Sequence, residues 1–241
     1  MGWLRFDAIR RGLAIASPET VLELGAGEGA MACRLAQQYD YVGVEPDPTS
    51  CSVLRERLEK LGAGDSRSGS VDALGADETF DLICAFEVLE HIEDDVGALR
   101  AWSSHLQDAG WLLISVPAHS DRFGPTDEAV GHVRRYDRDA LVRALHGGGF
   151  EVVQLTSYGM VAGHVADCVR NAVVRRRNFD ESREGRTAAS GRLMQPKSSA
   201  TGVLRWAAAL PFRAVQRPLA STDSGIGYVA LARRASGARH Q

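Results

Sequence analysis

The sequence lacks the features of a membrane-spanning chain or of a disulfide-stabilised secreted one. None of its apolar runs approaches the ~20 residues that a membrane-spanning helix requires. The N-terminal stretch MGWLRFDAIRRGLA has no apolar core of the kind found in signal peptides. The four cysteines form no CxxC pair, which argues against a disulfide framework and a zinc site; they are Cys33, Cys51, Cys84 and Cys168. We therefore expect a cytoplasmic protein.

The chain also lacks a large net charge, although its charges are unevenly distributed. The formal net charge of the 241 residues is only −3. Residues 19–100 carry 18 acidic and 6 basic side chains, whereas residues 170–217 carry 3 acidic and 11 basic ones. This asymmetry predicts that the two regions face different partners. Because the overall balance is negative and no nucleic-acid-binding motif is present, we expect no nucleic-acid partner.

What the sequence does contain is an alternation of apolar, strand-like runs with helix-like runs. Strands are predicted over residues 20–26, 41–47, 68–74, 110–117, 150–159 and 225–234, and the run TFDLICAFEVLEH (79–91) is predicted to begin as the fourth strand. Helices are predicted over residues 29–39, 50–62, 95–106 and 137–146. Such alternation predicts a doubly wound α/β domain with a mostly parallel sheet and right-handed crossovers.

A glycine-rich turn follows the first predicted strand, in the run Glu23-Leu24-Gly25-Ala26-Gly27-Glu28-Gly29. Glycines there let the backbone turn sharply and approach a ligand closely. Glu45, at the end of the second strand, stands where an acid accepts hydrogen bonds from ribose hydroxyls. The two features predict nucleotide-type binding. They leave its identity open, because Gly25, Gly27 and Ala30 also satisfy the dinucleotide pattern GxGxx(G/A).

An ordered set of motifs resembles the class I S-adenosylmethionine-dependent methyltransferases. The motifs are VLELGAGEG (21–29), VGVEPD (42–47), VDAL (71–74), FDLICAFEVLEHIED (80–94) and GWLLISVP (110–117). The resemblance covers roughly residues 20–157 and a last strand at 225–233. The run FDLICAFEVLEHI is similar to the corresponding motif in the branch of the family that methylates small metabolites, lipids and quinone-like compounds. The resemblance implies a seven-stranded sheet with an antiparallel last strand, and S-adenosyl-L-methionine as the cofactor.

The resemblance also implies which residues hold the cofactor. Four residues would line its methionine part: Glu23, Gly25, Ala26 and Gly27. Glu45 would hold the ribose, and the adenine would lie against Pro46, Asp72 and Ala73. Ala85, Phe86 and Glu87 would lie below the methionine and the sulfonium, with His91 at the rim. The acidic first half of the chain suits a cofactor that is cationic at sulfur and at its amine.

The segment before the first strand carries aromatic and arginine side chains. In related enzymes such a helix covers the cofactor, so we expect Arg10 or Arg11 to pair with the methionyl carboxylate. The alternative is a surface amphipathic helix. The predicted organisation is an N-terminal helix over 1–18, a methyltransferase core over 19–159 and 225–241, and an insert over 160–224 that forms an acceptor-binding lid.

The loop over residues 117–136, at the carboxyl end of the fifth strand, is the expected acceptor side. His132 is the leading candidate for a general base or acceptor contact, because an unperturbed histidine has a pKa of about 6.5. His119 is a second candidate base, and Tyr136 would orient the acceptor. The alternative is that His132 and Tyr136 simply pin this loop to the sheet through hydrogen bonds.

No metal is expected, because the acids and histidines of this loop match no recognised ligand spacing; they are His119, Asp121, Asp127 and His132. The predicted function is methyl transfer to a small-molecule acceptor, which the basic insert allows to be anionic, and a hydroxyl in secondary (natural product) metabolism is favoured. The basic insert would form a lid or meet a membrane surface. The alternatives are a peripheral membrane methyltransferase with a lipid-linked or quinone-like acceptor, and a non-catalytic S-adenosylmethionine-binding protein.

Overall fold

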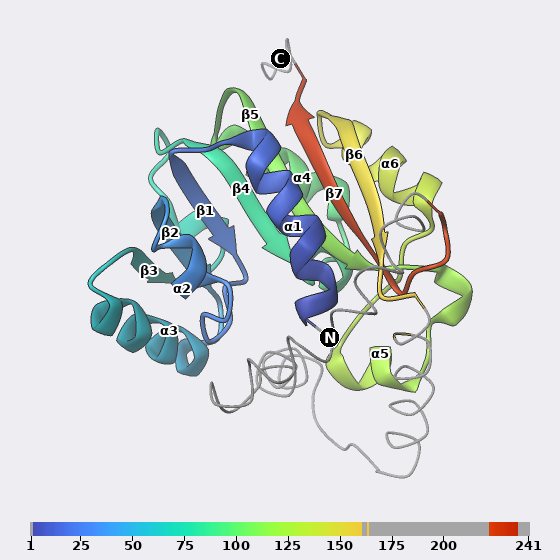
Figure 1. Cartoon of the computed structure of the whole chain (residues 1–241), viewed down its shortest axis with the longest axis horizontal. Coiled ribbons are helices and arrows are strands. Elements are labelled where there is room, and N and C mark those ends of the chain that lie inside the picture. Colours follow the sequence, from blue (N-terminus) through green and yellow to red (C-terminus); the bar gives the residue numbers. More distant parts are fainter. Residues whose placement is uncertain (1, 161–162, 164–221, 236–241) are drawn as a thin grey trace.

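The computed structural model describes residues 2–160, 163 and 222–235 (Figure 1). Its strands are β1 (Thr20–Leu24), β2 (Asp40–Glu45), β3 (Asp65–Ser68), β4 (Phe80–Phe86), β5 (Leu106–Pro117), β6 (Phe150–Tyr158) and β7 (Gly227–Arg234). They form a seven-stranded sheet in the order β3-β2-β1-β4-β5-β7-β6. Only β7 runs antiparallel to its neighbours β5 and β6, whereas the other pairs are parallel. The predicted fold class is therefore confirmed.

Helices cover both faces of this sheet. Buried side chains of α1 (Gly2–Ala16), α2 (Ala32–Leu35) and α3 (Pro48–Leu61) share one cluster with one face of the strands. On the other face lie α4 (Asp95–Ser104) and α6 (Arg138–Gly147), whose buried side chains share a second cluster with the strands. Figure 1 shows α1 lying across the sheet, with its N-terminal end at the edge where the parallel strands end. The molecule is thus a three-layer sandwich.

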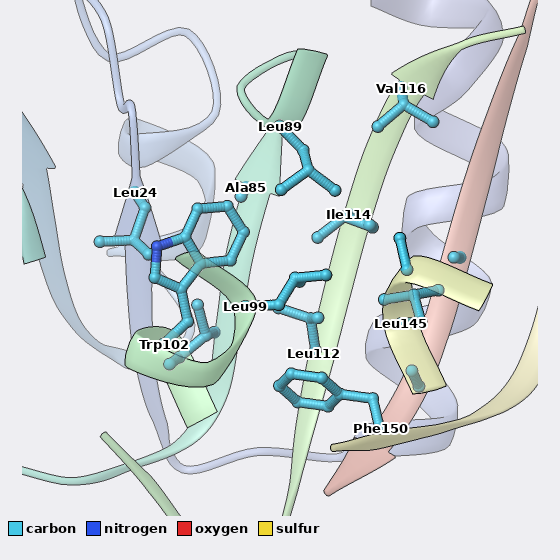
Figure 2. Close-up of a cluster of buried hydrophobic side chains, with 14 of the residues drawn as sticks. Leu24, Ala85, Leu89, Leu99, Trp102, Leu112, Ile114, Val116, Leu145 and Phe150 are labelled. Atoms are coloured by element: carbon cyan, nitrogen blue, oxygen red, sulfur yellow. The ribbon is translucent and has the colours of Figure 1, made fainter. Parts of the chain in front are cut away.

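The second cluster shows how the pattern of the sequence becomes a core (Figure 2). Leu99 and Trp102 of α4 and Leu145 of α6 face the sheet, where Leu112 and Ile114 of β5 meet them. All five side chains are at least 96% buried. Because these parallel strands are covered on both faces, they read in sequence as continuous apolar runs rather than alternating ones. This rigid core fixes the strand ends on which the site is built.

Local signals set the bounds of α3, which ends at Gly62 as the sequence predicted but begins at Pro48, two residues before the predicted start. Asp47 caps its start, with a side-chain oxygen that accepts a hydrogen bond from the Ser50 backbone N–H at 2.9 Å. Pro48 takes the first helical position, where its missing N–H is harmless. Gly62 ends the helix in the left-handed conformation, at a φ of 70°. The helix therefore starts directly after the carboxyl end of β2.

Two predicted elements are wrong in detail. The third strand is Asp65–Ser68, and Val71–Ala73 forms a 3-10 turn instead. The strand was missed because β3 is an edge strand that pairs only with β2 and carries no apolar side chain. The first predicted helix, over residues 29–39, is helical only at Ala32–Leu35, and the rest forms turns.

Three short elements complete the acceptor side: the 3-10 turns η2 (Leu89–His91) and η3 (Ser120–Arg122), and α5 (Pro125–Val130). The predicted lid, residues 160–224, lies outside the described residues except for Met160, Gly163 and residues 222–224. No helix within the described residues is long and apolar enough to cross a bilayer. The predicted division into helix, core and lid stays a prediction.

Candidate functional site

The expected cofactor residues converge at the carboxyl ends of β1, β2 and β4. Strand β1 pairs with β2 on one side and with β4 on the other, so the chain changes direction in the sheet at β1. Ligands of open α/β sheets bind in the crevice outside the strands at such a switch point. Gly25 follows β1, Glu45 ends β2 and Glu87 follows β4. Three of the predicted site segments thus meet at one edge.

The glycine turn after β1 is held tightly against its neighbours. Gly25 and Gly27 have φ angles of 69° and 56°, in the left-handed region that favours glycine. The backbone N–H groups of Gly25 and Ala26 both donate to the carbonyl of Val44, at 2.8 and 3.1 Å. A Cβ added at Gly25 would lie only 2.5 Å from Cγ2 of Val88. The turn therefore has no room for any side chain at Gly25.

Glu45 joins the first two loops of the site. Its Oε2 accepts a hydrogen bond from the Gly27 N–H at 2.7 Å, and its Oε1 accepts one from the Asp47 N–H at 2.9 Å. The side chain is buried, and burial raises the pKa of Glu45 although these two N–H groups act against the shift. An ionised carboxylate can accept about four hydrogen bonds, so two contacts leave capacity for ribose hydroxyls. Glu45 is thus placed both to shape the cradle and to hold a sugar.

The residues expected around the adenine lie at the rim beyond Glu45. The carbonyl of Glu45 accepts a hydrogen bond from the Gly69 N–H at 3.1 Å, which brings the 3-10 turn η1 (Val71–Ala73) beside β2. Pro46 and Asp72 are exposed, and Ala73 is half-buried. The exposed rim leaves these three positions accessible to a flat ring.

Glu23, near the end of β1, is a buried carboxyl group without a close cation. It is 3% exposed, and its Oε2 accepts a hydrogen bond from the Tyr41 hydroxyl at 2.7 Å. Burial raises the pKa of Glu23 to about 7, against the opposing effects of Tyr41 and of the Arg5 charge. A positively charged ligand group beside it would favour the ionised form.

Glu87 is the hub of a polar cluster directly after β4. Its Oε1 accepts hydrogen bonds from the hydroxyls of Ser115, at 2.8 Å, and Tyr158, at 3.1 Å. It also pairs with Nη1 of Arg5 at 3.1 Å. Burial acts to raise the pKa of Glu87, but the Arg5 charge and the two hydroxyl donors outweigh it and leave the pKa lowered. Glu87 is therefore ionised at neutral pH.

Ala85 and Phe86, the last residues of β4, have their side chains in the two core clusters on opposite faces of the sheet. Ala85 is 1% exposed and Phe86 is 8% exposed. A ligand at the strand end would therefore meet mainly their backbone.

Arg5 is a site residue that the sequence analysis missed. Its Nη1 reaches both Glu87 and the Ser115 hydroxyl at 3.1 Å, from the N-terminal part of α1. Arg10 and Arg11, which were expected to meet the methionyl carboxylate, are exposed. The missed signal was the helical period, because Arg5 precedes the buried Ile9 by four residues and so lies on the same helix face.

On the acceptor side, the turn η2 is joined to the end of the loop after β5. The Val133 N–H donates to the carbonyl of Glu90 at 2.9 Å. Nδ1 of His91 lies 3.2 Å from the carbonyl oxygen of Gly131. The rings of His91 and His132 meet edge to face, with their centroids 4.8 Å apart. Residues far apart in sequence thus form one compact cluster.

His132 is held in a fixed orientation within this cluster. Its Nδ1 lies 2.8 Å from Oδ1 of Asp127, whose carboxylate also accepts from Nε of Arg135 at 2.8 Å and from the Gly124 N–H at 2.9 Å. Burial acts to raise the pKa of Asp127, but the hydrogen bonds from His132 and Arg135 lower it below its usual value. An ionised partner at Nδ1 requires a proton there, so Nε2 carries the lone pair of the neutral ring.

His119 and Tyr136 hold the loop in place. Nε2 of His119 lies 2.9 Å from the carbonyl oxygen of Gly225, and its backbone N–H donates to the Tyr136 carbonyl at 2.8 Å. The hydroxyl of the buried Tyr136 donates to Oδ2 of Asp95 at 2.8 Å. This arrangement favours the pinning alternative for Tyr136, and catalytic roles for the two residues stay predictions.

Comparison with known proteins gives the site a context. Residues 5–155 match the family described as "Methyltransferase domain". Over 98 residues the chain is 36% identical to a ubiquinone biosynthesis O-methyltransferase of Methylocella silvestris, a region that covers 39% of this chain and 38% of the relative. The chain spans 38 to 55% of the length of the first three curated relatives that it matches.

Two solved structures share the fold. One is an S-adenosylmethionine-dependent methyltransferase from Clostridium acetobutylicum, with a TM-score of 0.54 and 14% identity over 63% of this chain and 81% of that one. The other is the N-methyltransferase NodS from Bradyrhizobium japonicum in complex with S-adenosyl-L-homocysteine, with a TM-score of 0.54 and 19% identity over 64% of this chain and 77% of that one. At such identities the likeness establishes the fold alone.

Proposed function

The chain belongs to the methyltransferase-domain family, and from this membership we propose that it transfers the methyl group of S-adenosyl-L-methionine to a hydroxyl oxygen of a small molecule. The membership confirms the resemblance drawn from the sequence motifs. The observation that carries the proposal is the cradle at the switch point, where the carboxylate of Glu45 bonds the backbone of the glycine turn at Gly27.

The charges around the cradle complement the cofactor. S-adenosylmethionine has a cationic sulfonium, a cationic amine and an anionic carboxylate. Glu23 supplies a buried carboxyl group and Glu87 a half-buried one near the expected methionine part, and Arg5 supplies the nearby cation. We assign Arg5 to the methionyl carboxylate, because a guanidinium can bind a carboxylate through two parallel hydrogen bonds. A dinucleotide pyrophosphate, with its two negative charges, would fit this acidic site poorly.

The reaction itself requires little covalent chemistry from the protein. A lone pair of the acceptor oxygen forms a bond to the methyl carbon, the carbon–sulfur bond breaks, and its electron pair stays on sulfur. The acceptor proton leaves to a base or to solvent. Holding the two reactants in line is the main contribution, since well-oriented reactions gain up to about 7–11 kcal/mol from positioning. We propose that His132 acts on the acceptor through its Nε2 lone pair. His119 is the second candidate base, and Tyr136 would orient the acceptor.

Two observations support the proposed acceptor, one for its hydroxyl group and one for its charge. The Methylocella silvestris relative is named as a ubiquinone biosynthesis O-methyltransferase, which favours oxygen and a quinone-like ring. The basic insert over residues 170–217 favours an anionic acceptor or an anionic membrane surface. The proposal has two narrower forms. In one, the protein acts in natural product metabolism in the cytoplasm. In the other, it methylates a lipid-linked acceptor at a membrane surface.

Calorimetry with S-adenosylmethionine and S-adenosylhomocysteine tests the proposal directly. We expect each to bind the folded protein at one site, and NAD to give no binding heat. If neither adenosyl compound binds protein whose circular dichroism shows it to be folded, the proposal is wrong. If both bind but no methyl group passes to a panel of catechol and phenol acceptors or to a cell extract, the non-catalytic alternative is favoured.

Replacing Arg5 with glutamine is expected to weaken S-adenosylhomocysteine binding by about tenfold or more, because a hydrogen bond to a charged group contributes about 1.5–3 kcal/mol. Arg10→Gln is the matched control on the same helix, since Arg10 is exposed. The measurement is the dissociation constant from calorimetry for the two variants. Loss of affinity in Arg10→Gln with none in Arg5→Gln would restore the expectation from the sequence and contradict the assignment to Arg5.

A further inference from the structure

Glu90 is a buried acid that has no role in the proposed reaction. It is 0% exposed, and neither of its carboxylate oxygens has a hydrogen-bond partner among the described residues. Burying an unpaired carboxylate is costly, so such groups are usually paired with a cation or bind a metal. Two arginines of this region pair with other acids, Arg5 with Glu87 and Arg135 with Asp127. Glu90 is therefore a buried carboxyl group that no described residue satisfies by a hydrogen bond.

Two imidazoles share the space beside this carboxylate. Nε2 of His132 lies 3.7 Å from Oε1 of Glu90. One donor atom from each of Glu90, His91 and His132 can be chosen so that all three lie within 4.8 Å of one another. A metal bound at about 2.0–2.2 Å places neighbouring donor atoms roughly 3–3.5 Å apart. The three donors lie farther apart than that here, so binding an ion would require side-chain rotations that draw them together.

The surroundings of the two imidazoles are those of metal ligands. A histidine that binds a metal usually donates its other ring N–H to a carboxylate or a backbone carbonyl, which fixes the ring. His132 has Asp127 at its Nδ1, and His91 has the Gly131 carbonyl at its Nδ1. Asp127 is in turn fixed by Arg135 and by the Gly124 N–H. These hydrogen bonds fix the orientation of both imidazole rings, as the partners of metal-bound histidines do.

We propose that Glu90, His91 and His132 bind a divalent metal ion. Two imidazole nitrogens and one carboxylate favour Mn²⁺, Fe²⁺, Co²⁺ or Zn²⁺ over Ca²⁺, which prefers oxygen ligands throughout. No metal was expected from the sequence, because only the acids and histidines of the loop over residues 117–136 were considered, and His132 alone of the three proposed ligands belongs to that loop.

The place of the site suggests what the ion does, and this step rests on the proposed function. Glu90 and His91 lie in η2, directly after the strand end that is expected below the sulfonium. Three protein ligands leave coordination positions for an acceptor oxygen, and a bound metal strongly lowers the pKa of a coordinated water, to about 7 for zinc. A coordinated hydroxyl would release its proton to solvent, and its oxygen would then attack the methyl carbon. His132 is then a metal ligand rather than the general base.

The test measures metal binding without the cofactor. The full chain is treated with a chelator, and Mn²⁺, Co²⁺ and Zn²⁺ are titrated by calorimetry, with Co²⁺ also followed by its visible absorption. We expect one ion per chain, and an affinity about a hundredfold or more lower in Glu90→Gln and His132→Ala, since even the loss of an outer partner typically costs 10–100-fold. His146→Ala, which removes an exposed histidine of α6, is the matched control and should bind as the wild type does.

Thermal unfolding keeps the test valid if a variant is damaged. Glu90→Gln keeps the shape of this buried side chain and removes its ionisable group, so without metal it should unfold at the wild-type temperature or above it. Added metal should raise the midpoint of the wild type and not that of Glu90→Gln. Equal affinity in the wild type and Glu90→Gln, or no binding by either, would overturn the metal site. Because S-adenosylhomocysteine binding is measured separately, failure of the metal site and failure of the proposed function are distinguishable.

Discussion

Replacing Glu45 with alanine is expected to weaken S-adenosylmethionine binding by about a hundredfold or more, the largest single effect in the cofactor site. The carboxylate bonds the backbone N–H groups of Gly27 and Asp47 and is placed to bond the ribose as well. Each hydrogen bond to a charged group contributes about 1.5–3 kcal/mol, and about 1.4 kcal/mol corresponds to a tenfold change in affinity. Loss of the carboxylate both frees the glycine turn and removes the sugar contact.

Calorimetry with S-adenosylhomocysteine measures this effect on Glu45→Ala and on two comparison variants. Glu45→Gln keeps one acceptor oxygen but sets an amide NH₂ against a backbone donor, so it should bind with intermediate affinity. Glu56→Ala removes an exposed acid of α3 that pairs with Lys60, so it should bind as the wild type does. An affinity of Glu45→Ala within threefold of the wild type would contradict the role of Glu45 and remove the main support for the cofactor site.

The strand-end residues of the site were predictable because topology brings them together. Once the sequence is interpreted as alternating strands and helices, the carboxyl ends of parallel strands must share one edge of the sheet. Gly25 and Glu45 therefore had to be neighbours, although they are 20 residues apart. The resemblance to the methyltransferase family also predicted the antiparallel last strand correctly, because it supplied the topology that periodicity alone does not give.

The contacts that the sequence did not predict join side chains across elements. Arg5 pairs with Glu87 from a helix 82 residues earlier, and Tyr41 bonds Glu23 from the next strand. Such pairs depend on rotamers and on which face of an element meets the sheet, which no local pattern encodes. The same limit hid the cluster of Glu90, His91 and His132, whose members come from two separate stretches of the sequence.

The glycine turn gives the second large effect, because Gly25 is constrained in two independent ways. Its φ of 69° strains any other residue, and a Cβ there would lie 2.5 Å from Cγ2 of Val88. Strained backbone costs about 1–3 kcal/mol, and overpacking typically costs about 1–3 kcal/mol more. We expect Gly25→Ala to lower the free energy of unfolding by about 2–5 kcal/mol and to abolish measurable S-adenosylhomocysteine binding.

Gly62→Ala separates the two causes, since Gly62 has nearly the same φ, 70°, but no heavy atom within 4 Å of an added Cβ. It should lose only the conformational part, about 1 kcal/mol, and keep wild-type cofactor affinity because it lies at the far end of α3. The double variant Gly25→Ala/Val88→Ala removes the clash and should recover part of the stability while cofactor binding stays weak, because the turn remains strained. Urea unfolding and calorimetry on the four proteins check this. If Gly25→Ala resembled Gly62→Ala in both stability and affinity, the tight turn over β1 could not be the cofactor cradle.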